Sequence, residues 1–146
     1  KVVVGDGPAL AGLKVRYPRV HFAGRQTGPA LAGYYAGADV FIFPSKTDTF
    51  GLVIIEALAC GTPVAAYPVT GPVDILTPES GAMHDDLDIA IQRALRLDPA
   101  DCIALGEQYS WHASADQFFD GLVSQERRLE CHMSRRILAK AIFARV

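Results

Sequence analysis

The sequence is poor in the residues that build disulfide frameworks and metal sites. Its three cysteines are far apart and form no C-x-x-C pair, and none of its four histidines belongs to an H-E-x-x-H motif. We therefore expect reduced cysteines, no bound metal and a cytoplasmic protein. Apolar runs are short as well. None approaches the roughly 18 residues of a membrane span, and no charged segment precedes an apolar one as in a secretory signal.

Charge is also sparse, and it is unevenly distributed. Only 21% of the 146 residues are charged and half are hydrophobic, which is typical of one folded domain rather than a disordered chain. A net charge of −2 gives no general attraction to nucleic acid, so we expect no nucleic-acid partner. Residues 124–146 are the exception: six basic and two acidic side chains give this segment a local charge of +4, and the rest of the chain sums to −6.

Short apolar runs alternate with helical patterns over the first hundred residues. This repeat predicts an α/β fold with an open, parallel, Rossmann-like sheet, followed by C-terminal helices. Such sheets bind ligands beyond the carboxyl ends of their strands, and Asp6, Arg25 and Asp48 each follow a predicted strand. The predicted strands are residues 1–4, 20–23, 40–43 and 64–67, with a weaker one at 82–83.

Residues 45–64, S-K-T-D-T-F-G-L-V-I-I-E-A-L-A-C-G-T-P-V, are the most informative segment. Seven residues separate two carboxylates, Asp48 and Glu56, and Glu56 lies within an otherwise apolar helical pattern. A charge is costly to bury without partners, so we expect Glu56 to bind a polar group. Residues 49–51 would present free backbone N–H groups at the start of a helix, where anions bind. Two acids around an anion-binding turn suit a nucleotide sugar, whose phosphates lie between hydroxyl-bearing rings.

This segment resembles the nucleotide-sugar signature of the retaining glycosyltransferases of family 4, which have the GT-B fold. The family pattern is Glu, seven residues and Glu, with F-G-L or F-G-I inside it and G-x-P-V after the helix. Asp48 stands here in place of the first Glu. The resemblance extends from Val2 to about Trp111. Its other motifs are G-D-G-P at 5–8, Y-P-R-V-H-F-A-G at 17–24, Y-Y-A-G-A-D-V-F-I-F-P-S at 34–45 and G-P-V-D-I-L at 71–76.

The resemblance implies the donor-binding, C-terminal half of a GT-B hexosyltransferase, lacking its first strand and helix. Such an enzyme moves a sugar from a nucleotide-diphosphate sugar to the hydroxyl of a lipid or glycan, and it needs neither metal nor cofactor. The N-terminal domain that binds the acceptor would be a missing partner, as would the Arg and Lys that neutralise the donor diphosphate. We expect residues 1–123 to form the nucleotide-sugar-binding domain and residues 124–146 a basic amphipathic helix. This piece alone should be inactive.

The resemblance also assigns roles to individual residues. Asp48 would contact the donor sugar with one methylene less reach than Glu, and Glu56 would accept hydrogen bonds from two ribose hydroxyls. Backbone N–H groups after Asp48 would bind the diphosphate, and Arg25 could stack on the base. The expected catalytic residue is Asp48, and the expected nucleotide-binding residues are Gly5, Gly24, Arg25, Thr49, Phe50, Gly51, Leu52 and Glu56.

Several alternatives stay open at this point. Asp48 could simply cap the helix, and Gly5 could belong to a strand-to-helix turn without a ligand. The whole protein could be a nucleotide-sugar 2-epimerase of the same fold, although epimerases lack the T-F-G-L-V helix pattern, or a non-catalytic nucleotide-binding module. The basic segment 124–146 could cross back to an N-terminal domain, or it could contact an anionic membrane surface and make the protein peripheral at the inner membrane face.

Two structural expectations follow from these assignments. Asp48, Glu56, Gly5 and Arg25 should share one crevice at the carboxyl edge of the sheet. Rossmann sheets place their first strand centrally, in the order 3-2-1-4-5-6, so a sheet without that strand has a gap. We therefore expect either poor stability or direct pairing of residues 1–4 with residues 40–43.

Overall fold

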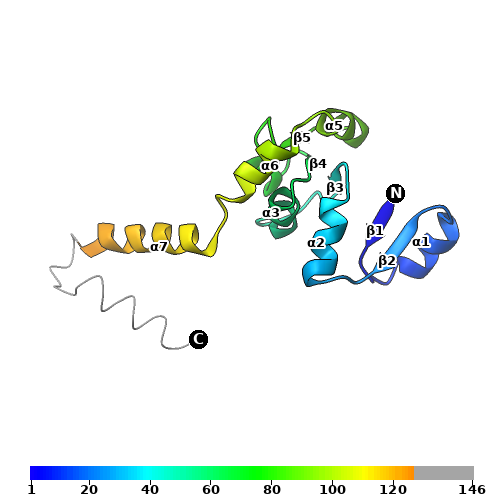
Figure 1. Cartoon of the computed structure of the whole chain (residues 1–146), viewed down its shortest axis with the longest axis horizontal. Coiled ribbons are helices and arrows are strands. Elements are labelled where there is room, and N and C mark those ends of the chain that lie inside the picture. The colour runs from blue at the N-terminus through cyan, green and yellow to red at the C-terminus, as the bar shows by residue number, and fades with distance from the viewer. Residues whose placement is uncertain (127–146) are drawn as a thin grey trace. The chain divides into compact units, whose positions relative to one another are not determined.

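The computed structural model describes residues 1–126, with side chains described up to residue 121. The chain separates into two compact units, Lys1–Gln108 and Tyr109–Val146. Strands and helices alternate through the first unit (Figure 1), as the sequence predicted. The elements are β1 (Val2–Val4), α1 (Leu10–Arg16), β2 (His21–Gly24), α2 (Gly28–Ala36), β3 (Phe41–Phe43), α3 (Leu52–Ala59), β4 (Val64–Ala66), α4 (Pro72–Ile75), β5 (Gly81–Met83), α5 (Leu87–Ala94), α6 (Pro99–Gly106) and α7 (Trp111–Glu126).

The strands form two parallel sheets rather than one. β1 pairs with β2, and β3, β4 and β5 pair in that order. Every pairing is parallel, which confirms the predicted α/β class. If β1 and β2 take the second and third places of a Rossmann sheet, the observed order is 3-2-1-4-5-6 without its central strand. The expected gap is therefore present. Of its two expected consequences, the direct pairing of residues 1–4 with residues 40–43 is not found, and poor stability stays a prediction.

The hydrophobic core surrounds the three-stranded sheet. All three residues of β4 have no exposed surface, as is usual for a parallel strand that helices cover on both faces. α5 packs on β4 and β5, with Ala90 and Ala94 against Ala65. Its cap is Asp86, whose carboxylate accepts a 2.9 Å hydrogen bond from the N–H of Asp88.

A second set of buried residues joins α3 to α6. Ile54, Ala57 and Leu58 on α3 are fully buried, and so is Cys102 on α6. Burial raises the pKa of the Cys102 thiol to about 11, so this thiol stays protonated in the core at neutral pH. α3 is therefore held on one side by the core, and this decides which of its residues are left at the surface.

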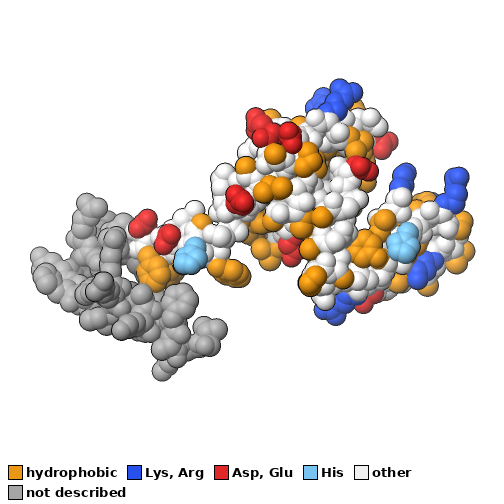
Figure 2. Space-filling view, viewed as in Figure 1, with side chains coloured by type: hydrophobic (Ala, Val, Ile, Leu, Met, Phe, Trp, Pro, Cys, Tyr) orange, Lys and Arg blue, Asp and Glu red, His pale blue; other side chains and the backbone are white. Residues whose placement is uncertain are grey.

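The segment that holds β1, α1 and β2 lacks a core of its own. None of the first 34 residues is buried, and hydrophobic side chains lie at the visible surface of this segment (Figure 2). The valines of β1 are 54%, 40% and 37% exposed, and Ile42 of β3 is 42% exposed. β1 and β3 are also the two strands that would border the missing central strand. Their exposed apolar side chains mark the gap in the sheet.

α7 continues across the boundary that the sequence predicted between residues 123 and 124. The predicted basic helix of residues 124–146 lies outside the described residues from residue 127 onward. Among the helices of residues 1–126, none is both long and apolar enough to cross a membrane.

The close approach of α6 to α3 gives a test of the core. A Cβ added to Gly106 would lie 2.6 Å from the backbone nitrogen of Ala59, so Gly106→Ala must push the two helices apart. We expect it to lower the free energy of unfolding by about 1 to 3 kcal/mol in urea titrations. Gly33→Ala in α2 is the matched control, because a Cβ there meets no atom within 4 Å. Equal destabilisation by both substitutions would contradict this packing.

Candidate functional site

Asp48 organises the turn that leads into α3. Its Oδ1 atom accepts hydrogen bonds from the backbone N–H groups of Phe50, at 3.0 Å, and Gly51, at 2.9 Å. Gly51 has a φ of 76°, and a Cβ there would lie 2.9 Å from Cδ1 of Ile54, so this position requires glycine. The structure thus contains the capping role for Asp48 that the sequence left as an alternative.

The same turn leaves other N–H groups for an anion. Two of the expected donors, at Phe50 and Gly51, are already bonded to Asp48. The N–H groups of Leu52 and Val53, the first two of α3, have no hydrogen-bond acceptor among the described residues. They lie at the positive end of an eight-residue helix, where the helix dipole favours negative charge.

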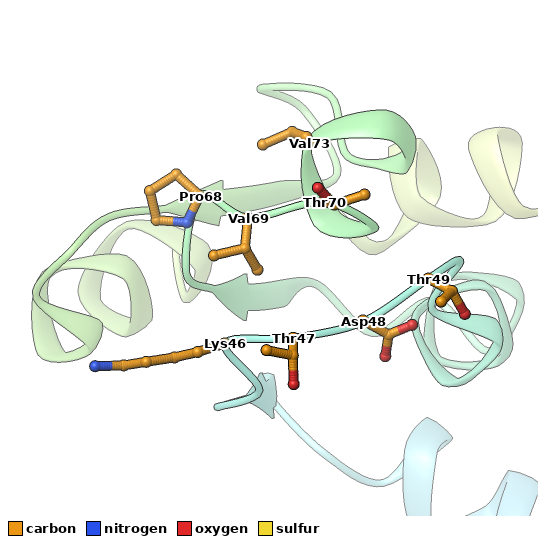
Figure 3. Close-up of a pocket in the computed structure, with 8 residues that line it drawn as sticks. All are labelled: Lys46, Thr47, Asp48, Thr49, Pro68, Val69, Thr70 and Val73. Carbon is orange, nitrogen blue, oxygen red and sulfur yellow. The ribbon is translucent and has the colours of Figure 1, made fainter.

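A cavity of about 820 Å³ lies beside this turn, at the carboxyl ends of β3 and β4. Two loops line it side by side, one after each strand (Figure 3). They approach each other at Gly71, where an added Cβ would lie 3.3 Å from Cβ of Asp48. The cavity is thus where parallel α/β sheets bind ligands. Its lining residues are Lys46, Thr47, Asp48, Thr49, Pro68, Val69, Thr70 and Val73.

Lys46 is a cation on the cavity wall that sequence reasoning missed. Its Nζ atom lies 5.0 Å from the centre of the Tyr67 ring, a cation–π distance, and its side chain extends away from Asp48 (Figure 3). No spacing in the sequence pointed to it, because the contact joins the loop after β3 to the end of β4. Lys46 can place positive charge near this cavity.

Glu56 lies on the next turn of α3 and does not line the cavity. The sequence suggested that apolar neighbours would bury it, but Ile54, Ala57 and Leu58 face the core while Glu56 is exposed. Its Oε2 atom accepts a 3.3 Å hydrogen bond from the hydroxyl of Tyr35 on α2. Burial, together with the nearby Glu56 charge, raises the pKa of Tyr35 to about 12.

The predicted base-binding residues form a separate group. The N–H of Gly5 donates a 2.8 Å hydrogen bond to the carbonyl of Gly24, so these two glycines meet at the carboxyl ends of β1 and β2. Arg25 is exposed beside them. No hydrogen bond in the described part of the chain joins this pair to Asp48 or Glu56, so the single crevice stays a prediction. Among residues 1–126, no three His, Cys, Asp or Glu side chains are grouped to hold a metal ion.

Comparison with known proteins identifies relatives of the chain. Residues 1–97 match the family model described as glycosyl transferases group 1. The chain is 39% identical over 87 residues to the GDP-mannose-dependent alpha-mannosyltransferase of Mycolicibacterium smegmatis, covering 60% of this chain and 23% of that protein. It is 33% identical to the D-inositol 3-phosphate glycosyltransferase of the same organism, covering 92% of this chain and 36% of that protein.

One solved structure adds a likeness in three dimensions. Sucrose-phosphate synthase from Thermosynechococcus elongatus superposes with a TM-score of 0.61 at 33% identity, over 84% of this chain and 38% of that chain. In all three comparisons the chain spans less than two fifths of the other protein.

The capping role of Asp48 can be tested by two substitutions. Asp48→Ala removes both hydrogen bonds to the turn and should cost about 1 kcal/mol of unfolding free energy. Asp48→Asn keeps an acceptor oxygen at the same place and should cost only a few tenths of that amount. Urea titrations of the two variants measure the difference. If they lose the same stability, Asp48 does not hold the turn through its oxygen.

The pKa of Tyr35 predicts a loss of stability at high pH. It is about 12 in the folded chain against 10.0 for a free tyrosine, so the folded state keeps a proton that the unfolded state has released. The stabilisation is complete below pH 10 and disappears as the pH rises to 12. We expect the unfolding free energy to fall more steeply over this range in the unmodified chain than in Tyr35→Phe. If the unfolding free energies of the unmodified chain and of Tyr35→Phe fall equally steeply over this pH range, the prediction is wrong.

Proposed function

Because the chain belongs to the glycosyl transferases group 1, we propose that it is the donor-binding part of a retaining glycosyltransferase. The enzyme would move a sugar from a nucleotide-diphosphate sugar to an acceptor hydroxyl. The observation that carries this proposal is the start of α3, where free N–H groups follow a turn whose carboxylate, Asp48, lines a cavity of about 820 Å³ at the strand ends.

The donor diphosphate would bind at the start of α3. The N–H groups of Leu52 and Val53 are available there, and the dipole of α3 favours an anion. Lys46, on the wall of the adjacent cavity, would add positive charge. It is a candidate for part of the neutralisation that other residues supply in the family pattern.

The donor sugar would then occupy the cavity, with Asp48 on its wall. Oδ1 of Asp48 holds the turn, but a carboxylate has a second acceptor oxygen, and Oδ2 accepts no hydrogen bond from the described residues. This oxygen can accept from a sugar hydroxyl while the turn stays intact. Asp48 would thus combine the capping role with the sugar contact.

The nucleoside would extend in the other direction, toward Glu56 and the strand ends of β1 and β2. Glu56 is exposed and retains acceptor capacity for ribose hydroxyls beside its bond to Tyr35. Gly5 and Gly24 carry no side chain that could obstruct a base, and the planar guanidinium of Arg25 could stack on it. One relative is described as GDP-mannose-dependent, so GDP is the first nucleotide to test.

Transfer would follow the scheme of retaining enzymes. The bond from the sugar's anomeric carbon to the phosphate oxygen breaks, and the nucleoside diphosphate leaves with the electron pair. An acceptor oxygen bonds to the same face of the anomeric carbon, and its proton passes to the leaving phosphate. Positive groups at the diphosphate stabilise the charge that develops there. The acceptor would bind to another part of a longer protein.

The alternatives have less support. The family model and both curated relatives are transferases rather than epimerases, and neither is described as a non-catalytic module. For location, we propose the cytoplasm, consistent with unpaired Cys60 and Cys102. Contact of the basic residues 124–146 with anionic lipid would place the protein at the inner face of a membrane.

Nucleotide binding by a Glu56→Gln variant tests the proposal. The substitution keeps an acceptor for Tyr35 but removes the charge that strengthens bonds to ribose, so GDP affinity should fall about 5- to 30-fold, equivalent to roughly 1 to 2 kcal/mol. Calorimetric titration with GDP and UDP measures the nucleotide affinities of the variant and the unmodified chain. Glu79→Gln, at an exposed glutamate outside the site, is the matched control and should bind like the unmodified chain. A chain that binds neither nucleotide would refute the proposed function.

In the full-length enzyme, the effect of Asp48→Asn should differ from that of Glu56→Gln. Asp48→Asn should reduce donor-sugar hydrolysis more than nucleotide affinity, because Asp48 faces the sugar cavity and Glu56 does not line it. A donor-hydrolysis assay combined with calorimetry separates the two effects. If Asp48→Asn weakens GDP binding as much as Glu56→Gln does, the sugar-contact role of Asp48 is excluded.

A further inference from the structure

We propose that Tyr35 is a positioning residue for nucleotide binding, because its hydroxyl orients the Glu56 carboxylate toward the two ribose hydroxyls. This inference rests on the proposed function and adds a residue to it. Tyr35 lies on α2, 21 positions before Glu56 in the chain, and its hydroxyl donates the 3.3 Å hydrogen bond to Oε2 of Glu56.

Tyr35 is itself held in place from several sides. Only 9% of its surface is exposed. Its ring meets Phe41 of β3 edge to face, with centroids 5.3 Å apart and planes at 89°. Its backbone carbonyl accepts a 2.7 Å hydrogen bond from the buried hydroxyl of Thr62. A phenol anchored in this way holds its O–H group in a fixed position. The hydrogen bond from this O–H group therefore fixes the orientation of the Glu56 carboxylate.

Glu56 needs such an orienting contact. It is exposed on α3, and the long side chain of a glutamate there has many rotamers in the absence of a partner. Two neighbouring ribose hydroxyls can both donate to one carboxylate only if its plane faces them. The bond from Tyr35 restrains Oε2, while Oε1 and the second acceptor site of Oε2 stay available. The Glu56 carboxylate is thus preorganised and still has free acceptor sites for the ribose hydroxyls.

The protonation of Tyr35 is consistent with this role. Because burial and the Glu56 charge raise its pKa to about 12, the phenol keeps its proton and remains a donor throughout the physiological range. The contact could instead serve only Tyr35, since a buried tyrosine hydroxyl needs a hydrogen-bond partner. These two roles make different predictions for ligands with and without ribose hydroxyls.

The test compares GDP with 2′,3′-dideoxy-GDP by calorimetry. The unmodified chain should bind GDP more tightly, because only GDP has the two hydroxyls for Glu56. In Tyr35→Phe, which keeps the packed ring, GDP affinity should fall about 3- to 10-fold, whereas affinity for the dideoxy nucleotide should stay within about twofold. When Tyr35→Phe is combined with Glu56→Gln, it should lower the GDP affinity little further, because the charged group that Tyr35 orients is already lost.

Thr62→Val is the structural control. It removes the hydrogen bond to the Tyr35 carbonyl but leaves the phenol, so any loss it causes should be equal for the two nucleotides. If Tyr35→Phe also weakens both nucleotides equally, or leaves the preference for GDP unchanged, the positioning role is refuted while the proposed function stands. If the unmodified chain does not distinguish the two nucleotides, Glu56 does not bind ribose and the inference fails. Failure to bind GDP or UDP at all refutes the proposed function itself.

Discussion

The burial of one side of α3 is the constraint on which the rest of the site depends. Ile54, Ala57 and Leu58 are fully buried, and α6 approaches so closely at Gly106 that a single added methyl group would meet the backbone of Ala59. A helix held in this way cannot rotate. Its first turn must therefore lie at the carboxyl edge of the sheet, and Glu56 must lie on the side that faces Tyr35. Core packing and site geometry are consequences of the same contacts.

The replacement of the family's first Glu by Asp48 acquires a physical meaning in this setting. An aspartate side chain is short enough to accept hydrogen bonds from the N–H groups two and three residues ahead, and Asp48 does so at 3.0 and 2.9 Å. A longer glutamate is less suited to this cap and reaches further into a ligand site. The shorter side chain therefore holds the turn through Oδ1, and Oδ2 accepts no hydrogen bond from the described residues. In the proposed function this geometry would give Asp48 less reach toward the sugar than a glutamate has.

The two halves of the described sheet differ in how firmly they are held. β4 is completely buried between helices, whereas none of the first 34 residues is buried. The predicted phosphate and sugar contacts lie on the well-packed half, and the predicted base contacts at Gly5 and Gly24 lie on the other. A nucleotide that spans both would depend on whatever fills the gap between β1 and β3, because parallel strands normally need both neighbours and covered faces.

The sequence by itself determined the parallel α/β class, the order of the elements, the turn at Asp48 and the family, because these follow from periodicity and from motifs a few residues long. The tertiary structure decided what Asp48 and Glu56 contact. Tyr35 and Glu56 are 21 positions apart, and Lys46 and Tyr67 lie on different loops. The exposure of Glu56 was mispredicted because apolar neighbours in sequence need not cover a side chain on the outer face of a helix. Contacts of this kind arise only when helices pack on the sheet, so no local pattern could have predicted them.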